Sequence, residues 1–452
     1  MVFSSLLFIF IYLPAVLGGY LIIGHKFKTL YLLICSLIFY AWGEPRYIYL
    51  LIICFLTNYI WGILLEKYKS NSVLLCIAMV TNLSILVWFK YGDFISSQFG
   101  KPLGIIMPIG ISFYTFQAMS YCIDVYRRDT TAEKNPLNLA LYISFFPQLI
   151  AGPIVKYKDI AQQLHIQMDT LEKRSDGFRR FVYGLGKKVL IANTLGYFVD
   201  NAITVSNSPN FILAWTVAIY YSLQIYFDFS GYSDMAIGLG LLFGFSFQEN
   251  FNRPYICTSI TEFWRRWHIS LGEWFKQYVY IPLGGNRCSR FRTLINLFIV
   301  FILTGIWHGA NWNFLLWGIY NSIWIILERT FLLKTLKKNK YLSHIYSLIV
   351  ISTGWIIFRI ENITEMTAYL SAMFLPWLSL KSNPFSDVYL FINHKQIVMI
   401  LIGIVLSGTH KRIRSKIQSN PLVESIILFS IFALSILSLA SDTYNPFIYY
   451  RF

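Results

Sequence analysis

Long apolar runs alternate with short polar segments along the chain. The clearest runs lie near residues 3–23, 46–65, 73–89, 103–123, 211–227, 293–307, 312–327, 343–358, 396–408 and 422–440. An apolar run of about 20 residues is long enough to cross the roughly 30 Å hydrocarbon core of a bilayer as a helix. The pattern therefore predicts an all-α, polytopic membrane protein with roughly 11–13 spanning or re-entrant helices. Since no polar stretch is long enough to form a second domain, we interpret residues 1–452 as a single membrane domain.

The composition supports this interpretation. Of the 452 residues, 56% are hydrophobic and only 13% are charged, whereas an ordinary soluble domain has roughly 25% charged residues. These proportions exclude a soluble globular enzyme and a disordered chain. The net charge is +16, but the basic residues form short clusters between apolar runs. We interpret the clusters as topology signals and predict no nucleic-acid partner.

The basic clusters predict the orientation of the chain, because short basic loops tend to stay cytoplasmic. The strongest cluster is 410–416, which we expect to be a cytoplasmic loop before the last span at 422–440. The C-terminus is then extracytoplasmic. The first basic residue is Lys26, so residues 3–23 lack the positive start of a cleavable signal peptide and are expected to be a retained first span. The basic stretch 173–188 fits either an interfacial helix or a solvated cytoplasmic loop.

The six cysteines do not indicate a disulfide framework or a metal site. They stand at positions 35, 54, 76, 122, 257 and 288, with no C-x-x-C pair. We expect small buried hydrophobic side chains and no bound metal.

Polar side chains collect inside the apolar sequence of residues 220–310. Ionisable residues at membrane depth are costly, and by default they line a cavity or a pathway. The substrate-binding or tunnel site is therefore expected here. Its candidate residues are Asp228, Ser230, Asp234, Asn250, Arg253, Trp264 and Trp307.

Two histidines are the candidate bases of this region. His308 ends an apolar run, and a neutral imidazole with a pKa of about 6.5 can accept a proton from an alcohol. Trp264 and His268 are four residues apart, which predicts that they share a helical face. Pro282 and the glycines after it interrupt the pattern, so residues 260–285 are predicted to form a partial or re-entrant helix. A histidine anchored at the interface and an ordinary aromatic belt are the alternatives.

Several ordered motifs together resemble the membrane-bound O-acyltransferase (MBOAT) family. The resemblance is closest to its bacterial branch of alginate and peptidoglycan O-acetylation membrane subunits. The motifs are Tyr40-Ala-Trp42, Phe145-Phe-Pro-Gln-Leu-Ile-Ala-Gly-Pro153, Tyr226-Phe-Asp-Phe-Ser-Gly-Tyr-Ser-Asp234, Asn250-Phe-Asn-Arg-Pro-Tyr255, Phe263-Trp-Arg-Arg-Trp-His-Ile-Ser-Leu271, Tyr280-Ile-Pro-Leu-Gly-Gly285 and Gly305-Ile-Trp-His-Gly309.

The resemblance implies more than the pattern shows. His308 takes the position of the near-invariant family histidine, and His268 that of the second histidine. The implied fold is a ring of helices around a central tunnel in a bacterial inner membrane. The implied donor is acetyl-CoA or another acyl thioester from the cytoplasm, with no bound cofactor. The implied partner is an extracytoplasmic SGNH-type acyltransferase or esterase that serves a polysaccharide acceptor.

The C-terminal residues 447–452 match the Phe-x-Tyr-x-x-Phe motif of that branch, with Tyr449 as the motif tyrosine. In related teichoic acid D-alanylation systems the motif lies on a separate subunit, so its presence here favours acetylation. Aromatic residues that pack at the membrane interface are the alternative.

The residues suggest a relay of the acyl group through Tyr449, with direct transfer as the alternative. A phenol has a pKa of about 10, so an aryl ester keeps much of the transfer potential of a thioester. His308 is the expected general base on Tyr449, and His268 is expected to position or polarise the donor carbonyl. Asp228 and Asp234 are expected to order the site through hydrogen bonds. A polytopic transporter or flippase, a D-alanyl transferase and an inactive scaffold are the alternatives.

Overall fold

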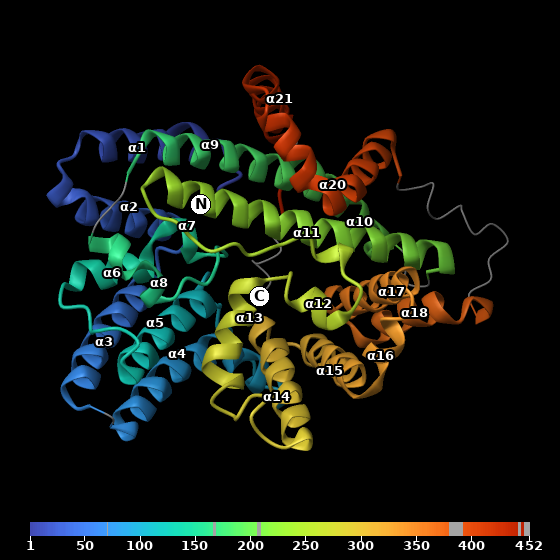
Figure 1. The fold of residues 1–452 in the computed structure, drawn as a ribbon, viewed down its shortest axis with the longest axis horizontal. Helices are drawn as coiled ribbons and strands as arrows, with labels where there is room; N and C mark the ends of the chain where they lie inside the picture. The colour runs from blue at the N-terminus through green and yellow to red at the C-terminus, as the bar shows by residue number, and fades with distance from the viewer. Residues whose placement is uncertain (70, 166–168, 206–208, 379–391, 442–443, 447–452) are drawn as a thin grey trace. The chain divides into compact units, whose positions relative to one another are not determined.

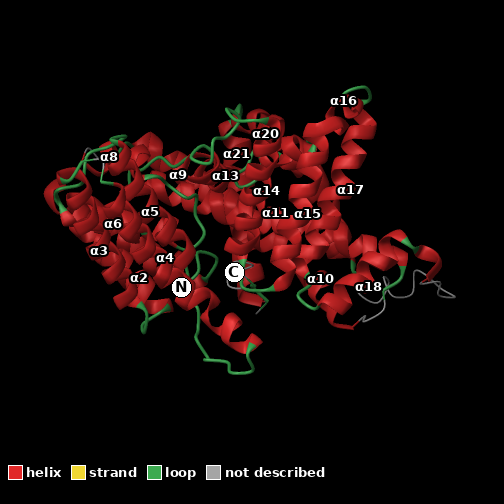
Figure 2. Cartoon of the chain, turned by 90° about the horizontal axis from the view of Figure 1, so that it is seen from below, coloured by secondary structure: helices red, strands yellow, loops and turns green. Residues whose placement is uncertain are grey.

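The structure is a computed structural model that describes residues 1–69, 71–165, 169–205, 209–378, 392–441 and 444–446, with only the backbone described at 409–418 (Figure 1). Within these ranges the regular elements are helical and none is a strand (Figure 2). The all-α prediction is confirmed. The chain divides into two compact units, one of Met1–Val182 with Tyr232–Glu249 and one of Tyr183–Gly231 with Asn250–Phe452. The single domain over residues 1–452 stays a prediction.

In the first unit, helices pack around α5 (Ile111–Arg127), which is buried along most of its length. Helices α3 (Ile48–Lys67) and α4 (Ser72–Gln98) pack on it. Asn58 and Asn82 exchange side-chain hydrogen bonds of 2.9 Å, which removes the cost of burying two unpaired amides. The remaining helices of this unit are η1 (Phe8–Tyr12), α1 (Leu13–Ile22), η2 (His25–Phe27), α2 (Lys28–Gly43), α6 (Pro136–Ser144), α7 (Phe146–Leu149) and α8 (Tyr157–His165).

The predicted span at 103–123 begins too early. Residues 101–110 are irregular, and α5 starts only at Ile111. Pro108 has no backbone N–H to donate, and Gly110 has a φ of 77°, in the left-handed region. These two residues end the irregular segment and set the start of the helix.

The second unit contains the tightest helix pair, α14 (Arg290–His308) and α15 (Trp312–Leu327). Gly305 and Gly318 meet in this interface, and a Cβ at Gly318 would lie 2.6 Å from the carbonyl oxygen of Phe301. The small residues let the two backbones approach closely. The remaining elements are η3 (Lys187–Ala192), α10 (Asn193–Val205), η4 (Pro254–Ile256), α12 (Ile260–Trp264), α13 (Ile269–Phe275), η5 (Lys276–Tyr280), η6 (Glu328–Leu332), α16 (Leu333–Leu336), α17 (Lys340–Arg359), α18 (Ile363–Phe374), η7 (Pro376–Leu378), α20 (His394–Gln418) and α21 (Pro421–Ser441).

Two long helices belong partly to each unit. They are α9 (Leu171–Gly186) and α11 (Phe211–Leu242). The basic stretch 173–188 is helical, since it covers most of α9 and the start of η3, and this excludes the interpretation as a loop. The basic cluster 410–416 is also helical, as the end of α20, so the prediction of a loop there is wrong.

Five described helices, α3, α4, α14, α17 and α21, are long and apolar enough to cross a membrane. Phe8–Ile22 and His394–Gly408 are shorter apolar helices. Each of these segments coincides with a predicted apolar run, so the chain is a polytopic membrane protein. The total of 11–13 spanning or re-entrant helices and the central tunnel stay predictions.

Candidate functional site

His268 lies at a break between two short helices. Helix α12 ends at Trp264, and His268 precedes α13 with a φ of 44°. A left-handed residue cannot continue a right-handed helix. The prediction of a broken, partial helix over 260–285 is therefore confirmed, but the prediction that Trp264 and His268 share one helical face is wrong.

The hydrogen bonds of Asn250 determine which nitrogen of His268 carries the proton. The Oδ1 atom of Asn250 accepts a bond of 3.2 Å from the backbone N–H of Ser270, which can only donate. The same oxygen lies 3.2 Å from Nδ1 of His268, so Nδ1 must be the protonated nitrogen. The lone pair is therefore on Nε2, which has no hydrogen-bond partner among the described residues.

The His268 ring is only 2% exposed. It lies outside the five spanning helices, and burial lowers its pKa to about 3. The imidazole is therefore neutral at physiological pH. Its Nε2 atom is a buried hydrogen-bond acceptor.

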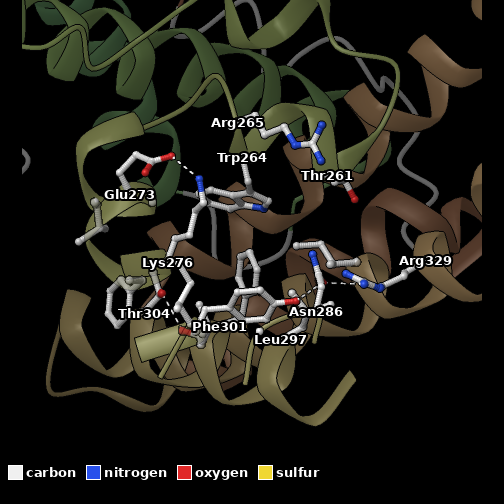
Figure 3. Close-up of a pocket in the computed structure, with 18 of the residues that line it drawn as sticks. Thr261, Trp264, Arg265, Glu273, Lys276, Asn286, Leu297, Phe301, Thr304 and Arg329 are labelled. Atoms are coloured by element: carbon white, nitrogen blue, oxygen red, sulfur yellow. Dashed lines mark hydrogen bonds and ion pairs between the residues drawn. The ribbon is translucent and has the colours of Figure 1, made fainter. Parts of the chain in front are cut away.

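A cavity of about 1170 Å³ borders His268 within the second unit (Figure 3). This volume exceeds that of most small-molecule sites. Aromatic and aliphatic side chains form much of its wall, with Trp264, Leu297 and Phe301 among them. The indole N–H of Trp264 donates to Oδ1 of Asn321 at 3.2 Å, which fixes the ring against the cavity. The wall suits an apolar or weakly polar chain more than a free sugar.

Cationic side chains gather at the same cavity. Glu273 also lines the cavity, and its carboxylate forms an ion pair of 3.0 Å with the ammonium of Lys276 (Figure 3). The guanidinium of Arg329 donates to Oδ1 of Asn286 at 2.7 Å, which orients it. Phosphate groups are a typical ligand of such a cluster. The cations are Arg265, Lys276, Arg287 and Arg329, all with exposed side chains.

His308 ends α14 in an aromatic environment. Its ring centroid lies 5.1 Å from Trp307, 5.2 Å from Trp317 and 5.1 Å from Phe358. The ring of His268 lies 6.1 Å from the same Trp307. The structure therefore brings the two predicted histidines to one indole ring. Of the described residues on α14, the cavity lining reaches Thr304, one turn before His308.

Asp228 and Ser230 flank Phe229 on α11. The Asp228 carboxylate forms an ion pair of 2.5 Å with Lys188, and both side chains are 2% exposed. The ring of Phe229 lies 4.6 Å from that of His268. The hydroxyl of Ser230 is buried and has no hydrogen-bond partner among the described residues.

The remaining predicted residues are Asp234, Arg253 and Tyr449. Asp234 belongs to the first unit, where its carboxylate pairs with Arg180 at 2.8 Å, and Arg180 also pairs with Glu249 at 2.5 Å. Arg253 precedes η4 with a φ of 47° and lies outside the described cavity lining. Tyr449 lies outside the described residues.

Glu328 is a residue of this region that the sequence reasoning missed. Its carboxylate is 1% exposed and accepts bonds from the backbone N–H groups of Ile260 at 2.5 Å and Thr261 at 2.8 Å. A carboxylate at a helix N-terminus is favourable, so Glu328 fixes the start of α12. A lone acid directly after the apolar run at 312–327 was the available signal.

Residues 79–366 match the family model described as "MBOAT, membrane-bound O-acyltransferase family". The chain belongs to the membrane-bound O-acyltransferase family. The matched range includes both histidines, the cavity and the Lys188–Asp228 pair. The resemblance in the motifs is confirmed, and the chain is a membrane acyltransferase.

The chain aligns with relatives whose names give three different acyl-transfer activities. The chain is 38% identical to the probable alginate O-acetylase AlgI of Pseudomonas putida, over 100% of both chains. It is 35% identical to the peptidoglycan O-acetyltransferase of Helicobacter pylori, over 82% of this chain and 80% of that one. It is 30% identical to the teichoic acid D-alanyltransferase of Bacillus subtilis, over 62% of this chain and 74% of that one.

Proposed function

We propose that this membrane acyltransferase takes an acetyl group from a cytoplasmic thioester and moves it across the membrane, where it serves the O-acetylation of a polysaccharide. Similarity over the full length to an alginate O-acetylase supports acetyl as the group. The teichoic acid D-alanyltransferase aligns over a smaller share of this chain, which makes D-alanyl transfer the second candidate. The proposed location is the bacterial inner membrane with the C-terminus outside, and the proposed partner is an SGNH-type acyltransferase or esterase.

One observation carries the proposal: a buried, neutral His268 lines a large cavity that has cations around it. Acetyl-CoA has phosphates at one end and an apolar arm with amide N–H groups at the other. The phosphates match Arg265, Arg287 and Arg329. His268 lines the cavity and is expected to position the donor, which leaves polarisation of the carbonyl to other groups.

The transfer step then belongs to His308 and Tyr449. His308 takes the phenolic proton, and the phenolate oxygen attacks the thioester carbonyl. A new C–O bond forms, the C–S bond breaks, and the thiolate leaves with the proton that His308 held. In a second step an acceptor hydroxyl attacks the aryl ester and releases the phenol, without any other energy source.

Purified protein incubated with radiolabelled acetyl-CoA tests the proposal, with an acceptor oligosaccharide added to half of the samples. We expect label on the protein or on the oligosaccharide. His308→Ala should remove the label, and His25→Ala, on an exposed side chain of η2, should keep it. A transporter or flippase predicts that neither protein nor oligosaccharide becomes labelled although acetyl-CoA binds.

A further inference from the structure

Three consecutive residues near the C-terminus contact polar side chains of the second unit. The Tyr444 hydroxyl donates to Oδ2 of Asp200 at 2.7 Å. The Asn193 side-chain amide donates to Oδ1 of Asn445 at 3.1 Å. The Lys188 ammonium donates to the carbonyl oxygen of Pro446. The tail at 444–446 therefore runs antiparallel to η3 and α10, since its later residues contact earlier positions of those helices.

These partners are held by the fold and are not mobile surface groups. Lys188 is paired with Asp228 at full burial, and a buried charge is tolerated only with such a partner. Asp200 is paired with Arg359 at 2.5 Å, at the end of α17. The Arg359 guanidinium in turn lies 5.9 Å from the ring centroid of Tyr221. Charged side chains of η3, α10, α11 and α17 thus form the site that contacts the tail.

Adjacent residues of α11 link the site to His268. Asp228, which holds Lys188, directly precedes Phe229, and the Phe229 ring lies against His268. Anchoring one reactant in this way raises its effective concentration at the other.

We propose that Lys188, Asn193 and Asp200 form a docking site for the C-terminal tail of this chain at Tyr444–Pro446. They are positioning residues, because they act through the tail and not on the acyl group. The docking itself depends only on the contacts above, whereas its use in acyl transfer rests on the proposed function.

A disulfide trap tests the docking in the full-length protein. Asn193→Cys with Asn445→Cys places two thiols at the observed contact, and mild oxidation should join them. Asn201→Cys with Asn445→Cys is the matched control, because Asn201 lies about two turns further along α10. Mass spectrometry should find the 193–445 peptide and no 201–445 peptide. Equal yields, or no 193–445 peptide, would overturn the docking site.

Rates of acetyl transfer test whether the docked position of the tail is the one used in catalysis. Tyr444→Phe with Asn445→Ala removes two tail contacts and leaves the Lys188–Asp228 pair intact. We expect a fall of about tenfold in kcat with an unchanged KM for acetyl-CoA. Keeping Tyr444→Phe but using Asn445→Asp, which retains the acceptor oxygen, should recover part of the loss. Tyr197→Phe, which deletes an exposed hydroxyl beside the Tyr444 ring, is the control and should be silent.

The outcomes separate the two proposals. A lowered melting temperature with an unchanged kcat would reduce the contacts to a structural role and overturn positioning. A trapped disulfide in a protein that transfers no acetyl group from any thioester would leave docking intact and contradict the proposed function. Trapped protein that still transfers acetyl groups supports the docked tail as the active arrangement.

Discussion

The histidine site and the tail docking site are both buried in the second unit, but they use opposite chemistry. Aromatic rings surround His308, and an amide oxygen with a phenylalanine ring contacts His268. Two carboxylate–cation pairs dominate the docking site, Asp228 with Lys188 and Asp200 with Arg359. Burial keeps the His268 imidazole neutral, whereas charged groups contact the tail at 444–446. In the proposed function, the first region transfers the proton and the second positions the tail.

The largest effect of a substitution should be the loss of acetyl transfer in His308→Ala. Loss of a general base typically costs a factor of about 10² to 10⁴ in rate. The variant should still insert and fold, so the melting temperature in detergent should change little. Initial rates with acetyl-CoA and an acceptor oligosaccharide measure the effect. A His308→Ala rate equal to that of the wild type would show that His308 is not the general base.

Charge removal in the docking site should act on stability instead. Lys188→Met leaves Asp228 buried without its cation, and breaking such a pair typically costs about 3–5 kcal/mol. Lys188→Met with Asp228→Leu removes both charges and should recover most of the melting temperature, yet not the transfer rate. If the single and double variants melt alike, the pair does not hold this region together.

Replacing Asn250 by aspartate should introduce a charge into the histidine site, as in the tail docking site. Asn250→Asp places a negative charge against the Nδ1–H of His268 and raises the imidazole pKa from about 3. As the pH falls toward the raised pKa, Nε2 becomes protonated and loses its lone pair. Donor binding should therefore weaken on the acid side between pH 8 and 5 in the variant and stay flat in the wild type. Superimposable profiles of KM against pH would contradict the assigned tautomer.

The smallest effect is expected at the cationic side chains of the cavity. Arg287→Gln should raise the KM for acetyl-CoA by roughly two- to fivefold at low salt, since an exposed charge contributes little in water. High salt should reduce the difference. Arg290→Gln is the control, because Arg290 lies outside the described cavity lining and bonds to the carbonyl of Thr330. Equal effects of both variants would mean a general charge effect.

The sequence predicted the helices better than the contacts. Apolar runs such as 46–65 and 422–440 coincide with α3 and α21, because a bilayer requires long apolar segments. The start of α5 and the position of the break at His268 were not predicted, since a single left-handed backbone reverses the expected geometry. Asp228 and Asp234 were grouped as polar residues within the apolar sequence 220–310, but they belong to different units.

The docking site could not be found from the sequence pattern. Its contacts join positions 244 to 258 residues apart, and local periodicity carries no information on such pairs. The tautomer of His268 likewise depends on the backbone of Ser270 meeting the side chain of Asn250, which only the folded chain brings together. His268 and His308 were predicted as one site because the family motifs mark both.

Intact-protein mass spectrometry of Tyr449→Phe after exposure to acetyl-CoA tests the central claim most directly. The substitution keeps the ring and deletes the phenolic oxygen, while Tyr450→Phe makes the same change on the unspecified position of the motif. The account predicts an acetyl adduct on wild type and on Tyr450→Phe, and none on Tyr449→Phe. An adduct of equal yield on all three proteins would contradict Tyr449 as the acyl carrier.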